Sequence, residues 1–290
     1  MKLERKAMYV FCADHGVAVE GVSAYPEEVT RQMVRNFAAG GAAINVLCRQ
    51  YGIDAFIVDV GVKGEPEPGV IGRRIAPGTR NFLHEPAMTR EQAGRAIEIG
   101  TELAAGDYDI VGTGEMGIGN TTAAAAVVAA MTGRDPAEVV GRGTGIDDAR
   151  WRHKVEVVRR ALELHGPDPA DPLGVLAGVG GFEIGAMAGL ILGAAAGRIA
   201  VVVDGFIATA GALLAAGIEP GVREGMFFAH RSAEAGHAVA LEALEARPLL
   251  DLGMRLGEGT GAALAIGLIE SAVRLYNEMA TFDSAGVTSA

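Results

Sequence analysis

Short apolar runs alternate along the chain with longer segments whose apolar residues recur at helical spacing. The runs that predict buried β-strands are 7–13, 54–60, 109–113, 199–203 and 225–229. The segments that predict helices are 29–37, 42–51, 89–105, 120–131, 184–196, 232–246 and 261–279. This alternation predicts an α/β fold with a mainly parallel sheet flanked by helices, in a Rossmann-like three-layer arrangement.

Local signals place several boundaries. The prolines at 66, 68 and 77 mark segment 64–78 as a loop. Thr89 and Gln92 form a capping box at the start of one helix. We expect residues 1–254 to form the α/β domain, and residues 255–290 to be a C-terminal helical segment contributing to a small helical subdomain.

Polar or glycine-rich turns follow several predicted strands. They are Asp14-His15-Gly16, residues 112–120 and Asp204-Gly205. In open α/β sheets ligands bind beyond the carboxyl ends of the strands. We therefore expect these turns to meet at one binding site.

Composition narrows the class of function. The 290 residues carry a net charge of −11 without a basic cluster, which argues against nucleic acid and an anionic membrane surface as partners. The longest uncharged run, 116–133, contains polar residues, and its purely apolar part, 123–131, is too short to span a bilayer. Cys12 and Cys48 form no CxxC pair, so we expect buried free thiols in a reducing cytoplasm. The six histidines lack metal-ligand spacing, and we expect neither a metal nor a cofactor.

Glu258 stands between two glycines, directly before an apolar helical segment. Gly257 and Gly259 permit a sharp turn, and Thr260 is a candidate N-cap. A carboxylate projecting into open space from such a rigid loop suits a general base. The alternative is an ordinary glycine loop with a solvated glutamate.

Gly112-x-Gly114-x-x-Gly117 follows a predicted strand and precedes a helix. This pattern is typical of a dinucleotide-binding turn, with Asp135 as the acidic residue, and would indicate an oxidoreductase. A phosphate site is the second interpretation, because glycine N–H groups and a helix N-terminus bind anions, with Asn120, Thr121 and Thr122 as further donors. Close packing of a helix on a strand is the third.

Two further charged residues have both a functional and an ordinary interpretation. Lys154 can supply positive charge to a phosphate, or it can be a solvated helix lysine. Asp204 ends the most strand-like run, where an acid often holds a hydroxyl or a ribose; it can equally be a turn-forming residue before Gly205.

Ten blocks of the sequence follow one another in order over nearly the whole chain. They are 13–17, 21–26, 78–82, 86–89, 114–122, 141–145, 180–184, 204–206, 232–237 and 255–261. Together these blocks resemble the nicotinate-nucleotide–dimethylbenzimidazole phosphoribosyltransferases of cobalamin lower-ligand synthesis. The resemblance implies transfer of phosphoribose from nicotinate mononucleotide to 5,6-dimethylbenzimidazole or a similar azaarene, with inversion at the anomeric carbon. A catalytically weak or inactive relative that binds nucleotide or azaarene ligands is the alternative.

The resemblance also implies roles for individual residues. Glu258 matches the catalytic base, and Glu115 matches a second carboxylate near the benzimidazole. Residues that match the mononucleotide-binding region are Gly117, Gly119, Asn120, Thr121, Lys154, Asp204, Gly205 and Ser232. Residues that match the benzimidazole pocket are Tyr25, Met33 and Met116.

The family further implies a cytoplasmic homodimer. Family members usually begin with an additional segment that carries a Lys-Pro-Pro-Gly-Ser-Leu-Gly-like motif, whereas this sequence starts almost at its first strand. We expect the small subdomain to be incomplete as a result. We also expect a partner subunit to cover the apolar face formed by Leu264, Leu268, Leu275 and Met279.

Overall fold

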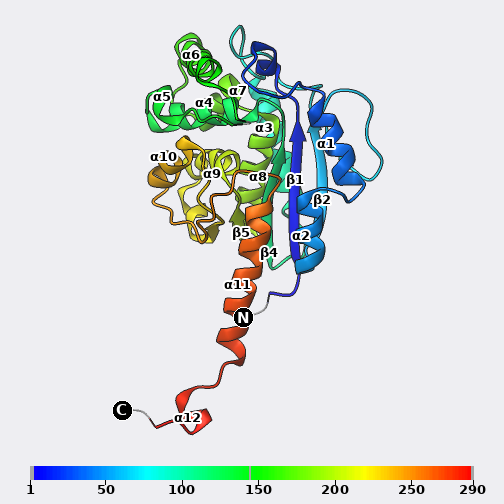
Figure 1. Ribbon diagram of the computed structural model, residues 1–290, viewed down its shortest axis with the longest axis vertical. Coiled ribbons are helices and arrows are strands. Elements are labelled where there is room, and N and C mark those ends of the chain that lie inside the picture. The colour runs from blue at the N-terminus through cyan, green and yellow to red at the C-terminus, as the bar shows by residue number, and fades with distance from the viewer. Residues whose placement is uncertain (1–2, 144, 289–290) are drawn as a thin grey trace.

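The computed structural model describes residues 3–143 and 145–288, so Thr144 of the block 141–145 lies outside the described residues. Within them, six parallel strands form one sheet in the order β3-β2-β1-β4-β5-β6 (Figure 1). The strands are β1 Lys6–Ala13, β2 Asp54–Gly61, β3 Ile71–Gly72, β4 Ile110–Met116, β5 Ala200–Val203 and β6 Met226–Phe228. The predicted α/β class with a parallel sheet is confirmed.

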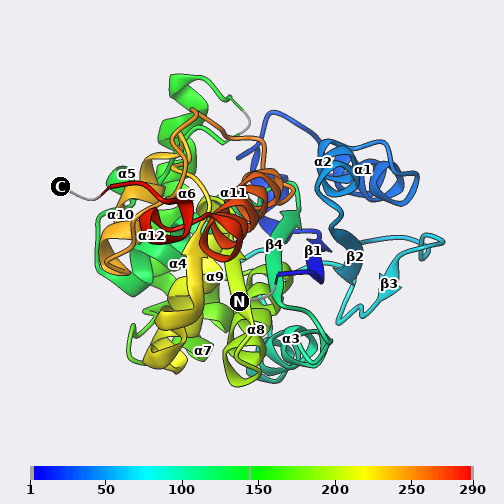
Figure 2. The ribbon, with the colours of Figure 1, turned by 90° about the horizontal axis from the view of Figure 1, so that it is seen from below.

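Helices cover both faces of the sheet (Figure 2). Met8, Val10 and Cys12 of β1 point to a core shared with α1 Val29–Ala38, α2 Ala43–Tyr51 and α11 Thr260–Glu278. Tyr9 and Phe11 point to the opposite core. This alternation follows from the period of two along a strand, and it makes β1 apolar throughout because both of its faces are buried.

The second face carries the larger core. Helices α8 Phe182–Ala196 and α9 Phe206–Ile218 pack on the strands there, while α3 Arg90–Leu103 packs on α8 and α4 Asn120–Thr132 packs on α9. The remaining helices are η1 Gly16–Glu20, α5 Pro136–Val139, α6 Asp148–His165, α7 Pro172–Val179, η2 Pro220–Gly225, α10 Ala235–Ala243 and α12 Phe282–Ala285. None of the described helices is both long and apolar enough to span a membrane.

Several predicted boundaries need correction. The loop 64–78 contains the short edge strand β3, which pairs with β2 once the prolines at 66 and 68 have been passed. Strand β4 continues to Met116 because it stays paired with β1 along its whole length. Helix α10 is shorter than the segment 232–246. The capping box of Thr89 and Gln92 is confirmed in both directions, and both cysteines are buried free thiols, as expected.

Helix α11 packs on the sheet differently from the prediction. Its first half contacts α2, β4 and β5 through Ala262, Ala263, Ala265 and Ile266. Leu268, Leu275 and Met279 are 47%, 61% and 71% exposed, and the second half of the helix extends away from the rest of the protein (Figure 1). The buried stripe of α11 therefore lies on its small residues. The division of the chain at residue 254 stays a prediction.

Candidate active site at the switch point of the sheet

The candidate site is a cavity at the carboxyl ends of the central strands. Strand order runs in one direction from β1 through β2 to β3, and in the other from β4 through β5 to β6. In sheets of this order the crevice at the reversal is the usual ligand site. A cavity of about 740 Å³ opens there. All of the predicted site residues except Lys154 line it.

Glu258 belongs to the cavity wall, but it does not project into open space as expected. Its side chain is 8% exposed, and Oε2 accepts a hydrogen bond of 3.2 Å from the backbone N–H of Ile44 at the start of α2. Burial raises the pKa of this carboxyl, which the Ile44 N–H partly offsets. A carboxylate held in this way on the cavity wall has the raised pKa and fixed position that a general base needs.

The backbone around Glu258 explains how the loop turns. Glu258 adopts a left-handed φ of 65°, and Gly259 follows with φ 93° at the cap position of α11. Thr260 is therefore the first helical residue and not the N-cap. Its hydroxyl donates to the carbonyl oxygen of Gly257 at 2.8 Å. The positive φ at a non-glycine residue is sparsely populated, and strain of this kind clusters at functional sites.

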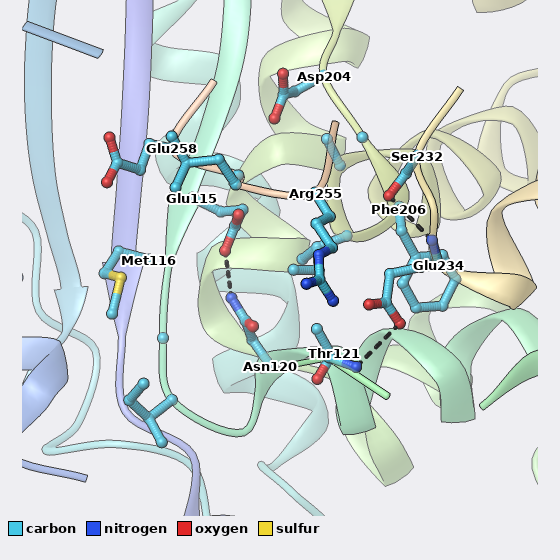
Figure 3. A pocket seen from close by; sticks show the side chains of 18 of the residues that line it. Glu115, Met116, Asn120, Thr121, Asp204, Phe206, Ser232, Glu234, Arg255 and Glu258 are labelled. Atoms are coloured by element: carbon cyan, nitrogen blue, oxygen red, sulfur yellow. Dashed lines mark hydrogen bonds between the residues drawn. The ribbon is translucent and has the colours of Figure 1, made fainter. Parts of the chain in front are cut away.

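Glu115, at the end of β4, is a second buried carboxyl in the same wall (Figure 3). Its Oε2 accepts a hydrogen bond from the side-chain amide of Asn120, the first residue of α4. Burial raises the pKa of Glu115 to about 8 in spite of that bond. Near pH 7 this carboxyl is mostly protonated.

The N-terminus of α4 forms the floor of the cavity. Gly119 caps the helix with φ 96°, a conformation that favours glycine, and Asn120 and Thr121 follow as its first residues. The positive end of a helix dipole at the N-terminus attracts anions. This geometry matches the phosphate interpretation of the glycine-rich turn.

Lys154 lies behind the N-terminus of α4, outside the cavity, and contacts Thr121. Its ammonium donates to the Thr121 hydroxyl at 2.9 Å and to the Gly141 carbonyl oxygen at 3.5 Å, and its side chain is fully buried. It is thus not a solvated helix lysine. Burial lowers the pKa of Lys154 to about 8. The structure holds it one side chain away from the cavity, with Thr121 between.

Asp204 follows β5 and is also buried. Its Oδ1 accepts from the backbone N–H of Ala262 in α11 at 2.9 Å, and its own N–H donates to the Thr113 hydroxyl at 3.1 Å. Burial raises the pKa of this carboxyl, while His230, at 3.9 Å, lowers it. Asp204 is therefore not merely a turn-forming residue, because it ties β4 and α11 together on the cavity wall.

The structure adds Glu234 and Arg255 to the predicted set. Glu234 Oε2 accepts from the backbone N–H of Gly143 at 3.3 Å, and the Arg255 side chain extends toward Thr121 and Glu234 (Figure 3). Among the described residues, Arg255 forms no ion pair. Both residues belong to blocks that carried the family resemblance, at 232–237 and 255–261. Spacing alone gave no sign that they line the cavity.

The opposite part of the cavity is apolar. Tyr25, Met33 and Met116 line it, as predicted, together with Val29 and Ile118. Tyr25 is 56% exposed at the edge of the cavity. A flat aromatic ligand fits such a surface, because methionine and tyrosine side chains pack well against rings.

The dinucleotide interpretation of Gly112 and Gly114 is wrong. Both lie inside β4, where an added Cβ would come within 2.4 Å of the Met8 side chain at Gly112 and of the Glu258 carbonyl oxygen at Gly114. They serve close packing and not a pyrophosphate. Asp135 caps the short helix α5 through the Ala137 N–H and pairs with Arg159, away from the cavity.

Sequence comparison agrees with this geometry. A family model described as phosphoribosyltransferase matches residues 1–287. The chain belongs to this family. It is 57% identical to the nicotinate-nucleotide–dimethylbenzimidazole phosphoribosyltransferase of a Geobacter species, covering 99% of this chain and 84% of that protein. The enzyme of the same name from Chloroflexus aggregans is 55% identical, with 99% and 83% covered.

Solved structures give the same result. CobT from Thermus thermophilus, whose crystal structure is known, is 50% identical to this chain, and the two structures superpose with a TM-score of 0.94. The match covers all of this chain and 88% of the CobT chain. The family match, the similar solved structure and the cavity at the switch point of the sheet all indicate the same conclusion. The chain is an enzyme of the phosphoribosyltransferase family.

Proposed function

We propose that the protein transfers phosphoribose from nicotinate mononucleotide to 5,6-dimethylbenzimidazole or a related azaarene. The products are α-ribazole 5′-phosphate and nicotinate, with inversion at the anomeric carbon. One observation carries the proposal: a single cavity joins an apolar end, an anion-attracting helix N-terminus and a buried carboxylate of raised pKa. These are the three features that the two substrates and the proton transfer require.

Glu258 is the general base in this proposal. One nitrogen of the imidazole ring attacks the anomeric carbon, and the bond from that carbon to the pyridinium nitrogen of nicotinate breaks. The pyridinium leaves with the bonding electrons as a neutral ring, so no acid has to protonate it. The proton on the other imidazole nitrogen passes to the Glu258 carboxylate as the new bond forms.

Glu115 supports this step as a neutral group. With a pKa of about 8, it adds little negative charge beside Glu258 at pH 7. The contrast between a protonated and an ionised carboxyl in one cavity is typical of acid–base sites. Its hydrogen bond with Asn120 connects the end of β4 to the start of α4.

The mononucleotide occupies the polar end. Its phosphate lies against the turn from Gly117 to Thr121, with Lys154 behind Thr121. Asp204, Gly205 and Ser232 face the ribose side. Arg255 extends into this part of the cavity and supplies a further positive charge to an anionic ligand.

The dimethylbenzimidazole occupies the apolar end, against Tyr25, Met33 and Met116. The rest of catalysis is positioning of the two rings and stabilisation of an oxocarbenium-like ribose. The enzyme acts in this proposal as a cytoplasmic homodimer. The apolar residues exposed on the second half of α11 support a partner subunit at that helix.

The test is an assay of the purified protein with nicotinate mononucleotide alone and with added 5,6-dimethylbenzimidazole. We expect nicotinate release only when the base is present, together with a product of the mass of α-ribazole phosphate. The anomeric proton in its NMR spectrum should report the α configuration. Binding of both ligands without turnover would favour the weak relative over the active transferase.

A further inference from the structure

Two cavity loops are joined beneath the surface by side chains that do not themselves line the cavity. Gly205 follows β5 and Ser232 follows β6, and both line the cavity. The backbone N–H of Ser232 donates to Nδ1 of His237 at 2.8 Å. Nε2 of His237 lies 3.0 Å from the Thr209 hydroxyl, which donates to the Gly205 carbonyl oxygen at 2.8 Å.

The two backbone groups at the ends of this series of hydrogen bonds determine the direction of each bond in it. A backbone N–H can only donate, so Nδ1 of His237 must be the acceptor. A carbonyl oxygen can only accept, so the Thr209 hydroxyl uses its proton toward Gly205. Nε2 of His237 must then carry the proton and donate to Thr209. Only the neutral imidazole protonated at Nε2 satisfies all three bonds.

Burial supports the same protonation state. His237 and Thr209 are both fully buried. Burial, with smaller contributions from the nearby His230 and Arg231, lowers the pKa of His237 to about 3. A charged imidazolium would turn two donors toward each other at Ser232. His237 is therefore a fixed donor and acceptor and not a proton-transfer group.

This series of hydrogen bonds determines how Ser232 and the start of α9 face the ligand. Ser232 Oγ accepts from the N–H of Glu234 at 3.3 Å, which leaves its proton available for a ligand oxygen. Gly205 is the cap residue of α9, and its carbonyl oxygen also accepts the Thr209 N–H at 2.9 Å. The first residues of α9, Phe206 to Ala208, line the cavity.

We propose that His237 and Thr209 are positioning residues that fix the spacing between Gly205 and Ser232 for the mononucleotide, through one histidine tautomer. This inference rests on the proposed function, because it assigns these loops to the mononucleotide side of the cavity. Neither side chain touches a substrate. Their effect appears in recognition of the mononucleotide and not in the proton transfer to Glu258.

The first test compares Thr209→Val with Thr209→Ser. Valine keeps the shape and removes the hydroxyl, so the KM for nicotinate mononucleotide should rise about tenfold while kcat stays within about twofold, as expected for loss of one buried hydrogen bond. Serine restores the hydroxyl and should restore the KM. Thr132→Val is the matched control, since Thr132 makes the same bond to a carbonyl four residues earlier, at the far end of α4.

An unchanged mononucleotide KM in Thr209→Val would overturn the inference. Equal increases in the KM values for both substrates would also overturn it, because they would indicate a general structural role. If Thr209→Val is poorly folded, His237→Gln provides a second variant, which keeps a donor toward Thr209 and loses the acceptor for Ser232. The same split between KM and kcat is expected.

The second test does not depend on turnover. Nitrogen-15 NMR of histidine-labelled protein at pH 7 should show one neutral imidazole protonated at Nε2 that is absent from His237→Gln. An imidazolium, or protonation at Nδ1, would overturn the inference. Without transferase activity in the wild type the proposed function fails, whereas this spectrum and calorimetry with nicotinate mononucleotide still decide the role of His237.

Discussion

Gly114 and Glu258 are in backbone contact: a Cβ on Gly114 would lie 2.4 Å from the Glu258 carbonyl oxygen. The missing side chain at Gly114 thus allows the loop that carries the proposed base to rest directly on β4. Gly112, two residues earlier on the same strand, is instead close to the flexible end of the Met8 side chain. The two glycines therefore differ in what a methyl group would displace.

This contact predicts that Gly114→Ala lowers kcat strongly, because the clash must move the Glu258 backbone. A displacement of about 1 Å near the reacting groups can cost on the order of 100-fold in rate. Gly112→Ala is the matched control and should cost much less, since the end of Met8 can move. Steady-state kinetics on both variants, with thermal unfolding as a check on folding, would measure the difference. Equal effects would show that the contact does not position Glu258.

Glu258→Gln keeps the shape of the side chain and removes its basicity. We expect kcat to fall by roughly 10²–10⁴ while both substrates still bind. Glu115→Gln should cost less, because Glu115 is already mostly neutral near pH 7. Turnover at saturating substrates and calorimetric binding would separate the two effects. A larger loss at Glu115 than at Glu258 would reverse their roles.

The raised pKa of Glu258 predicts an acidic limb in the pH profile. The base must be ionised, so kcat should fall as the pH drops through the pKa of Glu258 in the bound complex, and level off above it. Because burial raises this pKa, the limb should lie above the usual range of a glutamate. In Glu258→Gln the residual activity should lose the limb, and its persistence there would assign it to another group.

Lys154 predicts a different pH dependence for binding. With a pKa of about 8, it loses its charge as the pH rises through that value, so affinity for the mononucleotide should fall above pH 8. Lys154→Met keeps the aliphatic chain and should weaken the mononucleotide at pH 7 without affecting benzimidazole, which carries no phosphate. Calorimetry with each ligand measures both effects. Equal weakening of the two ligands would point to a structural role.

Much of the fold was predictable because both faces of β1 and β4 are buried, which leaves continuous apolar runs in the sequence. Strand β3 was not, because two residues at a sheet edge carry no period. The burial of Glu258 also escaped prediction. Its environment depends on the N–H of Ile44, which is 214 residues away in the chain and brought close only by the fold.

The candidate site shows the same limit. The glycine pattern around Gly114 fitted a dinucleotide turn as well as a packed strand, because a sequence does not show what approaches a missing side chain. Lys154 resembled a surface lysine by its helical position, yet α6 turns it inward to Thr121. Arg255 and Glu234 became visible as cavity residues only when distant loops met at the end of the sheet.

The exposed second half of α11 carries the last prediction. Leu268 and Leu275 lie on it and Met279 directly follows it, with 47%, 61% and 71% of their surfaces exposed. Fully burying such a side chain contributes roughly 1.5–3 kcal/mol, so burial of these residues against a partner subunit would stabilise a dimer. Changing Leu268 and Leu275 together to Asp should therefore give monomers in sedimentation, while Asn277→Asp, on the opposite side of the same helix, is the control and should remain a dimer. A folded dimer of the double variant would show that the subunits meet elsewhere, and a monomeric wild type would show that α11 is not an interface at all.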